Sequence, residues 1–588
     1  MKKIKLNLIL LLLMLSQALP ETGASREKKV EELEKQVDYI NSQKSFFIKG
    51  RGMFIADNSF LNGSDVLTNK AQKKHDNYIA VDLALEKSIF PYIKAHGALR
   101  FYSDFSGFFV QGETFQVRDV WIEATAFDFL DIRLGNFYQE LSPLTMYLPA
   151  DPLGYKSGIF NLLEEVKRYN VYQRDNAWYM QGGKLTGNLK IKEFRPLDYL
   201  GFYASVTPYG SLDFKKFITA FNLDTGRSNF YGLQYCFLDY VDRSDKYLNQ
   251  NYSNYTADII INSVAAFFDT TVLLEKMNQE NKKPAMHGRV DTELAFSKYK
   301  GDTNGDWKGN ALHLKVYYEL FKNRLDFGFK SIDFAYYAPG AQSPSFYEEL
   351  NSLSTYFKGQ TNISGHFAER IYADDMAFNR IWARGTELIF PMGPATPNRQ
   401  GISLAYANRM LSFLEAEINY DMYKEKTAAG KYATNGNSTG LRKFSGLQAG
   451  LALNLHKVHA MLPDIAYSFS RQKQTRNDAN GNNNDNLTIK MHSCSLSWDP
   501  VEKLSLLAGL SIFNRSGFRH LEYNDALDPF MIQTVYYTGE MEETQLYAAA
   551  GAAYNINKNS RLVFYYDNKS EKGSYKQHGI NGYLSVLF

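Results

Sequence analysis

The chain has 588 residues, a formal net charge of +3 and 44% hydrophobic residues. Outside the extreme N-terminus it carries no apolar run of about 18 residues or more, which excludes a polytopic helical membrane protein. Its basic residues are scattered, so no nucleic-acid partner is expected. Cys236 and Cys494 are the only cysteines, which argues against a disulfide scaffold, a zinc site or an iron–sulfur cluster.

Residues 1–24 have the features of a secretory signal peptide. Lysines precede an apolar core that runs from Leu6 to Leu15, and small residues at 22–24, or alternatively at 16–18, offer a cleavage site. The core is shorter than a membrane-spanning helix requires. We therefore expect an exported protein.

Residues 25–44 predict a short periplasmic amphipathic helix. Val30, Leu33, Val37 and Ile40 follow the 3-4-3 spacing of a coiled-coil seam. The helix would either tether the protein in the periplasm and help it form a homotrimer, or lie as a solvated helix at the mouth of the domain that follows. Two heptads are too short to associate strongly alone, so the sequence leaves both hypotheses for this helix open.

From residue 45 to 588 the dominant pattern is strict alternation over about ten residues, the length at which a tilted strand crosses a bilayer. Segments 77–87, 93–104 and 414–423 show it clearly. In the last of these, one face carries Leu414, Ala416, Ile418, Tyr420 and Met422, and the other carries Glu415, Glu417, Asn419 and Asp421. The 41 Tyr, 41 Phe and 41 Gly residues suit membrane strands with aromatic girdles, although a large soluble β-protein would share that composition.

Connection lengths favour a membrane barrel over a soluble sandwich. Short connections such as 88–92, 321–323 and 499–502 interleave with long polar ones such as 425–440 and 474–487. Short turns at one end and long loops at the other are typical of outer-membrane barrels. The sequence thus predicts an all-β fold, a single closed antiparallel transmembrane β-barrel.

The chain end supports the same fold. Gly582, Leu584, Val586 and the terminal Phe588 share one face of the last expected strand, and this pattern resembles the C-terminal signal that the bacterial barrel-assembly machinery reads. Following the turns gives about 22 strands, with a range of 18–24, and an even number is expected.

One hairpin resembles strand pairs of porin-like and alginate-export-type barrels. An Arg and acidic residues on an inward face precede a tight turn, and the next strand carries Arg-x-Gly; here these are Arg118, Asp119, Glu123, Arg133 and Gly135. The resemblance implies a barrel architecture and a transport role, and it indicates no substrate. TonB-dependent transporters are disfavoured, unless insertions fill the lumen, because a plug domain of over a hundred residues does not fit before strands that begin near residue 45.

Charged residues on the polar faces are the candidate pore-lining residues. Lys94, Arg100, Arg118 and Arg133 would form a basic ladder that favours anionic solutes if they share one wall. Charges of both signs follow at Arg289, Asp291, Glu293, Asp326, Lys330, Glu415 and Glu417. The alternative is that these charges pair across strands and only stiffen the wall.

Two long segments, 139–175 and 338–380, contain apolar residues that argue against disorder. We expect at least one of them to fold inward and narrow the pore; otherwise both are extracellular caps.

No metal or cofactor is expected. The Asp/Asn runs at 302–306 and 478–482 match the first half of a calcium loop but lack its Gly and Glu, so surface turns explain them better. No catalytic motif of a hydrolase or metalloprotease occurs.

The leading function is therefore a non-enzymatic porin-like channel in the cell outer membrane, for passive or substrate-selective diffusion of small polar solutes. Membrane lipid and the barrel-assembly machinery are the other expected partners. The alternative is a barrel whose lumen is plugged and which serves a structural role or binds partners at the cell surface. A hydrolase built into the barrel is the third and least favoured hypothesis.

Overall fold

The computed structural model describes residues 47–63, 73–104, 113–127, 129–147, 159, 177–191, 197–208, 216–227, 230–242, 257–270, 286–301, 305–338, 340–341, 389–390, 394–428, 440–477, 484–518, 540–571 and 575–587. The expected signal peptide, the helix over 25–44, Phe588 and most of the segment 338–380 lie outside these residues, as do the Asp/Asn runs at 302–304 and 478–482.

The described residues form one sheet of 22 strands. The first eleven are β1 (Phe47–Gly63), β2 (Lys73–Phe90), β3 (Ile93–Asp104), β4 (Glu113–Ala126), β5 (Leu130–Gln139), β6 (Trp178–Lys190), β7 (Tyr199–Pro208), β8 (Lys216–Arg227), β9 (Tyr231–Asp242), β10 (Ala257–Asp269) and β11 (Met286–Gly301). The others are β12 (Gly305–Leu320), β13 (Asn323–Ile332), β14 (Arg399–Asn408), β15 (Leu414–Lys424), β16 (Lys443–Leu453), β17 (Asp464–Arg476), β18 (Asp485–Val501), β19 (Leu504–Phe518), β20 (Glu540–Asn557), β21 (Ser560–Glu571) and β22 (Tyr575–Leu587). A short 3₁₀ helix, η3 (Leu455–Lys457), precedes β17.

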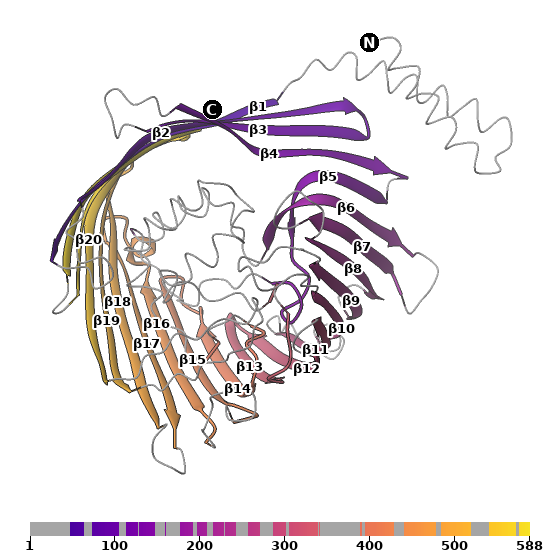
Figure 1. Cartoon of the computed structure of the whole chain (residues 1–588). Helices are drawn as coiled ribbons and strands as arrows, with labels where there is room; N and C mark the ends of the chain where they lie inside the picture. Colours follow the sequence, from indigo (N-terminus) through magenta and orange to yellow (C-terminus); the bar gives the residue numbers. More distant parts are fainter. Residues whose placement is uncertain are drawn as a thin grey trace, which may run out of the picture.

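Each strand pairs antiparallel with its neighbours in sequence, and β1 also pairs with β22 from Arg51 opposite Leu587 to Gly63 opposite Tyr575. This last pairing closes the sheet into the ring seen in Figure 1. Closure gives every strand a paired neighbour on each side, although β4 pairs with β5 only from Trp121 to Ala126. The predicted closed antiparallel barrel of about 22 strands is confirmed.

The two ends of the barrel differ. At one end the strands are joined mostly by short connections, such as Pro91-Tyr92, Phe321-Lys322 and Glu502-Lys503. In the second of these both residues have positive φ, 51° and 64°, as a two-residue hairpin turn of type I′ requires. We call this the short-turn end and the opposite one, which includes the connections 140–177 and 333–398, the long-loop end.

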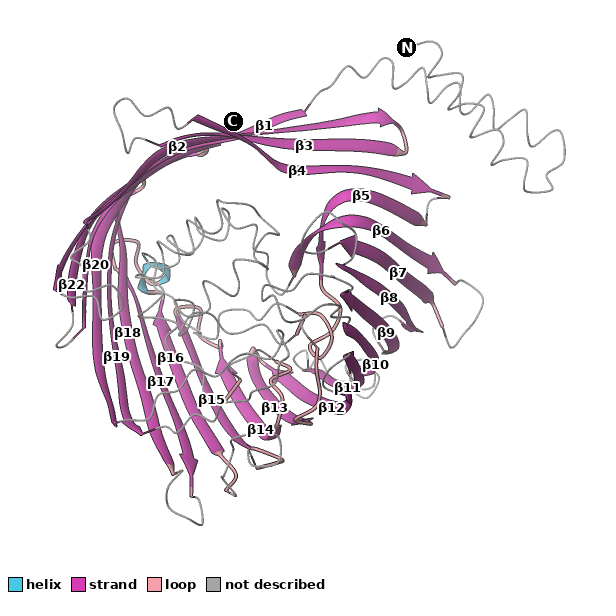
Figure 2. Ribbon diagram, viewed as in Figure 1, coloured by secondary structure: helices cyan, strands magenta, loops and turns pink. Residues whose placement is uncertain are grey.

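The apolar face of the strands points outward. Directly paired residues of antiparallel strands share a face, and on most strands one face holds the large apolar side chains that remain exposed, such as Ile122, Leu134, Phe296 and Ile418. The other face carries the buried clusters, and the described loops lie against it inside the ring (Figure 2). An apolar exterior around a more polar interior is the arrangement of a barrel in lipid, the reverse of a soluble sandwich.

No helix among the described residues is both long enough and apolar enough to cross a membrane.

Adjacent positions on β15 test which face meets hydrocarbon. Ile418 points outward and is 46% exposed, whereas Asn419 points inward beside Ala405 and Gln448. We expect Ile418→Lys to lower the free energy of unfolding from lipid bilayers by about 2–4 kcal/mol, while Asn419→Lys has a much smaller effect. Denaturant titration of the folded, heat-modifiable gel band measures both, and equal effects would contradict the assigned faces.

Candidate functional site

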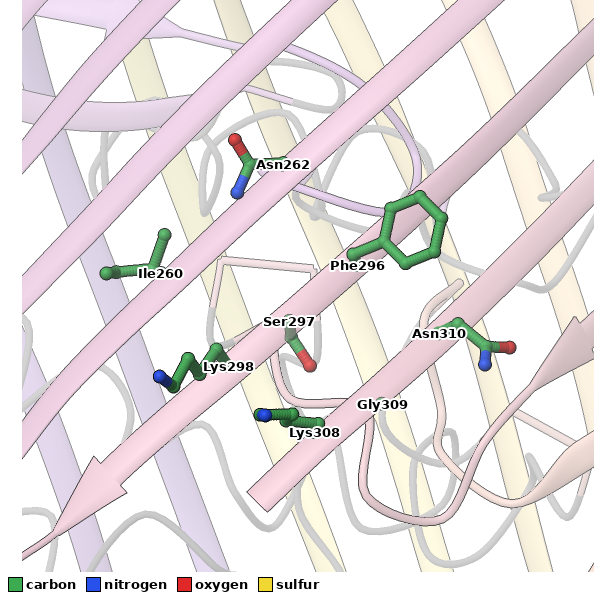
Figure 3. Close-up of a pocket in the computed structure, with 8 residues that line it drawn as sticks. All are labelled: Ile260, Asn262, Phe296, Ser297, Lys298, Lys308, Gly309 and Asn310. Carbon is green, nitrogen blue, oxygen red and sulfur yellow. The ribbon is translucent and has the colours of Figure 1, made fainter. Parts of the chain in front are cut away.

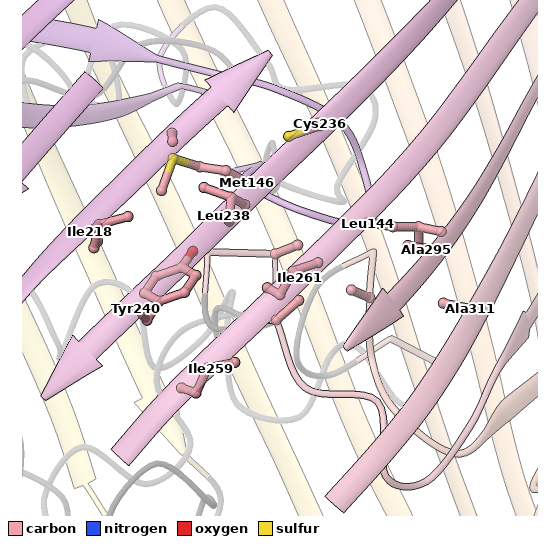
Figure 4. Packing of buried hydrophobic residues seen from close by; sticks show 14 of the residues in the cluster. Leu144, Met146, Ile218, Cys236, Leu238, Tyr240, Ile259, Ile261, Ala295 and Ala311 are labelled. Atoms are coloured by element: carbon pink, nitrogen blue, oxygen red, sulfur yellow. The ribbon is translucent and has the colours of Figure 1, made fainter. Parts of the chain in front are cut away.

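The lumen is the candidate site, and the segment 140–147 after β5 folds into it. Leu144 and Met146 of this segment are buried against the inner faces of β8 to β11, in the cluster that Figure 4 shows. Because these strands place Ile218, Leu238 and Ile261 on the inner face, the wall offers an apolar surface that the segment covers. The apolar side chains of this loop therefore pack inside the barrel.

Glu293 of β11 anchors this loop. Its carboxylate accepts hydrogen bonds from Ser142 Oγ at 2.5 Å, from Ser263 Oγ of β10 at 2.8 Å and from the backbone N–H of Leu144 at 3.3 Å. The side chain is only 3% exposed. Since a buried carboxylate is costly unless it is hydrogen-bonded, these three donors tie the loop to the wall.

A second inward segment, 333–341 after β13, binds the first. Tyr336 donates its hydroxyl proton to the carbonyl oxygen of Leu144 at 2.6 Å, and the N–H of Tyr147 donates to the carbonyl oxygen of Gly340 at 2.8 Å. Burial raises the pKa of Tyr336 well above its ordinary value, so this hydroxyl keeps the proton that it donates. The two loops form one connected layer on the inner wall.

This layer touches the wall so closely that a Cβ atom at either of two glycine positions would push a neighbouring group away. A Cβ atom on Gly309 of β12 would collide with the backbone of Tyr336. A Cβ atom on Gly340 would come within 2.5 Å of the hydroxyl oxygen of Tyr240 and 3.2 Å of the carbonyl oxygen of Thr145. Both contacts would have to open for any larger side chain.

The opposite wall of the lumen is also covered in part. Ile159, which belongs to the same insertion as Met146, is buried against Tyr547, Val563 and Tyr583 of β20 to β22. The insertion between β5 and β6 therefore contacts two walls that lie about half the ring apart. Contacts on both sides reduce the free cross-section of the lumen.

Residues that precede β14 cover a third part of the wall. Ile389 and Phe390 pack against Tyr423, Phe444 and inner-face residues of β18 and β19. Lys330 places its ammonium group 4.4 Å from the centre of the Phe390 ring and donates to the carbonyl oxygen of Pro394 at 3.3 Å. Lys330, a predicted pore-lining residue, thus holds this segment against β13.

Two predicted cations of the basic ladder share one counter-ion. Arg100 of β3 binds Asp82 of β2 through two hydrogen bonds of 2.6 and 2.7 Å, and Arg118 of β4 binds the same carboxylate. Arg118 reaches it because the pairing of β3 with β4 shifts between Ala98 and Leu99, and this β-bulge places Arg118 and Asp119 on the same inner face. Both arginines are buried, so they stiffen the wall.

The other two ladder residues lie nearer the short-turn end and stay accessible. Arg133 binds Glu123 at 2.6 Å and stacks over the Trp121 ring at 4.1 Å, and it is about one quarter exposed. Lys94 is exposed and lies in register with the same Glu123. The four cations therefore do share one wall, but acidic side chains neutralise much of their charge.

The remaining candidates form a mixed-sign wall. Arg289 binds its strand neighbour Asp291 at 2.7 Å, and Asp326 accepts from Arg324 at 2.7 Å, with Lys315 at 3.6 Å. On the β15 wall, Glu415 accepts a hydrogen bond from Asn454 at 3.3 Å and pairs with Arg409 at 3.7 Å.

Glu417 faces inward opposite Gly450 on this same β15 wall. Sequence alternation identified these faces. Ser142 and Gly340 lie in the segments 139–175 and 338–380 that were expected to fold inward, but nothing in the sequence singled out these two residues or Tyr336 as the ones that contact the wall.

No family model and no curated protein matches the chain. Among solved structures it is similar to the outer membrane protein OprD from Pseudomonas aeruginosa, with 11% identity, a TM-score of 0.36 and coverage of 76% of this chain and 93% of that one. It is also similar to OpdQ from Pseudomonas aeruginosa, with 10% identity, a TM-score of 0.34 and coverage of 94% of this chain and 99% of that one. For a BenF-like porin from Pseudomonas fluorescens Pf-5 the identity is 9%, the TM-score is 0.33, and the coverage is 92% of this chain and 98% of that one. Sequence identities and TM-scores this low do not place the chain in a family.

Removing the loop anchor should loosen the loop without unfolding the wall. In Glu293→Ala, Ser142 and the Leu144 N–H lose their acceptor, so amide hydrogen exchange of residues 141–147 should rise by about tenfold or more, since a hydrogen bond to a charged group contributes about 1.5–3 kcal/mol. Asp291→Ala is the matched control, because Asp291 lies on the same strand face and binds Arg289 instead. Equal exchange in the two variants would rule out Glu293 as the anchor.

Proposed function

We propose that the protein is an outer-membrane channel through which small polar solutes diffuse. The observation that carries this proposal is a closed barrel whose inner wall keeps charged side chains accessible beside inward-folded loops. Arg133, Glu123, Arg289 and Asp291 are each between one quarter and about one third exposed on that wall. Accessible charges inside a closed sheet suit a wetted lumen better than a dry, fully packed one.

The selectivity for solutes would come mainly from the width of the pore. The two connected loops and Ile159 cover the wall on several sides, and a narrowed pore rejects solutes by size. The wall charges occur as pairs, such as Arg133 with Glu123 and Arg289 with Asp291, so their fields largely cancel. A focused field that strongly favours one sign of solute needs charges of one sign, and the paired wall supports only a mild preference.

The route to the membrane remains part of the proposal. An N-terminal signal peptide would direct export, Phe588 would serve as the assembly signal, and the helix over 25–44 would promote a homotrimer. The apolar exterior of the barrel, for example Leu134, Phe296 and Ile418, supports the lipid environment that this route leads to. Passive diffusion needs no catalytic step and no cofactor.

Planar-bilayer recording on the purified protein tests the proposal. We expect discrete conductance steps, and larger ones for Glu293→Ala because the loop that it releases no longer covers the wall of β8 to β11. Asp291→Ala removes a carboxylate from the same strand but releases no loop, so it should change the conductance less than Glu293→Ala does. If the conductance of every variant stays at the protein-free background, the protein is not a channel, and a structural barrel with a plugged lumen is favoured.

Removing one accessible acid should change the ion preference. Glu123→Gln leaves Arg133 and Lys94 without the carboxylate between them, so the reversal potential in a salt gradient should shift toward anions. Glu86→Gln is the control, because Glu86 also faces the lumen but lies opposite His96. An unchanged reversal potential in Glu123→Gln would show that ions do not pass this part of the wall.

A further inference from the structure

The β5–β6 hairpin leaves the barrel wall partway along its length. β4 pairs with β5 only from Trp121 to Ala126, and β6 pairs with β7 only from Gly183 to Lys190. The two strands of the hairpin stay paired with each other as far as Gln139 and Trp178. In Figure 1, β4 continues along the ring, whereas β5 and β6 curve toward the interior. The long-loop half of the hairpin is therefore paired with neither neighbour in the wall.

The contacts of this half show that it lies inside the barrel. Phe137 is buried in the apolar cluster that covers the inner faces of β8 to β11. Ser205 of β7 donates a hydrogen bond to Gln139 Oε1 at 3.1 Å, although the register partners of these two residues are Lys184 and Trp178. Gln139 therefore reaches back over the inner face of β7 instead of continuing along the wall.

Two opposed glycines form the bend. Gly135 and Gly182 are register partners in the hairpin, and Gly135 has a φ of 115°. A Cβ atom on Gly135 would collide with the carbonyl oxygen of Val120 in β4, and one on Gly182 with the carbonyl oxygen of Val206 in β7. Because both residues lack a side chain, the hairpin turns inward while its backbone still touches both neighbours.

Beyond the bend, side chains take the place of strand pairing. Continued pairing of β4 with β5 would put the backbone of Asn136 opposite Val120. Instead, Asn136 Oδ1 accepts the Val120 N–H at 3.0 Å, and the Tyr179 hydroxyl donates to the carbonyl oxygen of Arg118 at 3.0 Å. Among the described residues, no strand pairs with β4 on this side before Trp121. We call the boundary between residues 115–120 of β4 and the bent hairpin the seam.

The seam lies in the lipid-facing part of the wall. Phe115 and Val117 on its β4 side and Val206 on its β7 side point outward and are each more than half exposed. On the opposite face of β4, Gln116 is the register partner of Arg100 and faces the lumen. Backbone at this depth that no strand pairs is tolerated where it lines a polar cavity. The seam therefore separates acyl chains from the lumen by a single layer of side chains.

The outward face of the hairpin changes character at the bend. Below it, Ile132 and Leu134 of β5 are exposed and apolar. Above it, the same face carries side chains that form hydrogen bonds: Asn136, Tyr138, Tyr179 and Gln181. Polar side chains beside the apolar residues of β4 suit a ligand with a polar head and an apolar chain. Single hydrogen bonds still span the seam, so its width suits one acyl chain at a time.

The wall is continuous where β10, β11 and β12 run side by side around a pocket of about 270 Å³ (Figure 3). β10 pairs with β11 from Ala257 to Asp269, and β11 pairs with β12 from Met286 to Gly301. Ala295 and Ala311 on the inner faces of these strands are fully buried. This part of the wall thus provides a reference in which strand pairing is complete.

We propose that the seam is a lateral gate, through which single-chain amphiphiles pass between the bilayer and the lumen. The acyl chain moves past Phe115 and Val117, and the polar head moves along Asn136, Tyr138 and Gln181. The gate opens when the hydrogen bonds that Asn136 and Tyr179 make to β4 are broken. The inference rests on the membrane placement proposed above and does not depend on conduction along the barrel axis.

Reaction of single cysteines with a maleimide that carries a hexadecyl chain tests the gate in lipid vesicles. Gln116→Cys and Asn419→Cys both face the lumen, but Asn419 lies on β15, away from the seam. In a background without Cys236 and Cys494, the cysteine at 116 should react about tenfold faster or more than the one at 419, because the acyl chain stays in the bilayer rather than in water. Outward-facing Cys494, retained alone in a further variant, gives the rate at the lipid face.

Weakening the seam should accelerate the reaction at position 116. Adding Asn136→Leu/Tyr179→Phe removes both bonds to β4, so the rate should rise by about fivefold or more, as expected for the loss of two ordinary hydrogen bonds. Asn262→Leu/Tyr235→Phe is the matched control. It removes an outward hydrogen bond between the same residue types, at 2.8 Å, from the complete wall of β9 and β10, and it should leave the rate unchanged.

Three results would overturn the lateral gate. Equal rates at 116 and 419 would show that the reagent enters through the ends of the lumen. No reaction at 116, with Cys494 reacting normally, would show that the seam stays closed, and equal acceleration by the two double variants would remove the two bonds as its closure. A water-soluble sulfonated maleimide that modifies the cysteine at 419 reports the wetted lumen separately, so the channel and the gate can fail independently. Heat-modifiable gel mobility verifies that each variant is folded.

Discussion

In hydrocarbon there is no water to satisfy a free backbone N–H or carbonyl group, so a sheet that crosses a membrane must pair every strand on both sides. The pairing of β1 with β22 meets this condition, and it joins segments more than 500 residues apart, as in the hydrogen bond from Arg51 to Ser585. Closure also separates two environments. The outward residues must be apolar, and the inward residues then become the wall of an enclosed space.

The inner wall shows what that enclosed space permits. Where the inner faces of β8 to β11 are apolar, the loops 140–147 and 333–341 pack against them. The buried carboxylate of Glu293 holds the first loop in place by accepting hydrogen bonds from Ser142 and Leu144, and it accepts a third from the wall itself. Where the wall is charged near the short-turn end, Arg133 and Glu123 remain accessible. Loop packing and accessible charge thus occupy different parts of the same lumen, which is consistent with a narrowed passage rather than a uniform pore.

Alternation over residues such as Ile418 and Asn419 predicted the faces, and the turns predicted the strand number, because both patterns are local. The pairing of charges was not predictable in the same way. Arg100 and Arg118 meet at Asp82 only through the register of three strands and a bulge, which a period of two does not encode. Alternation predicted an inner face for Glu293. Its hydrogen-bond partner Ser142 lies 151 residues away in the sequence, and no local pattern reveals that contact.

The central claim is that the apolar face of the barrel touches lipid while the polar face encloses water. Spin labels placed singly along β15 in lipid vesicles test it most directly, through collision rates with oxygen and with a water-soluble nickel complex. Labels at 418, 420 and 422 should be reached mainly by oxygen, and labels at 419 and 421 mainly by the nickel complex. Oxygen and nickel accessibilities without this period of two, or with the two faces exchanged, would contradict the account.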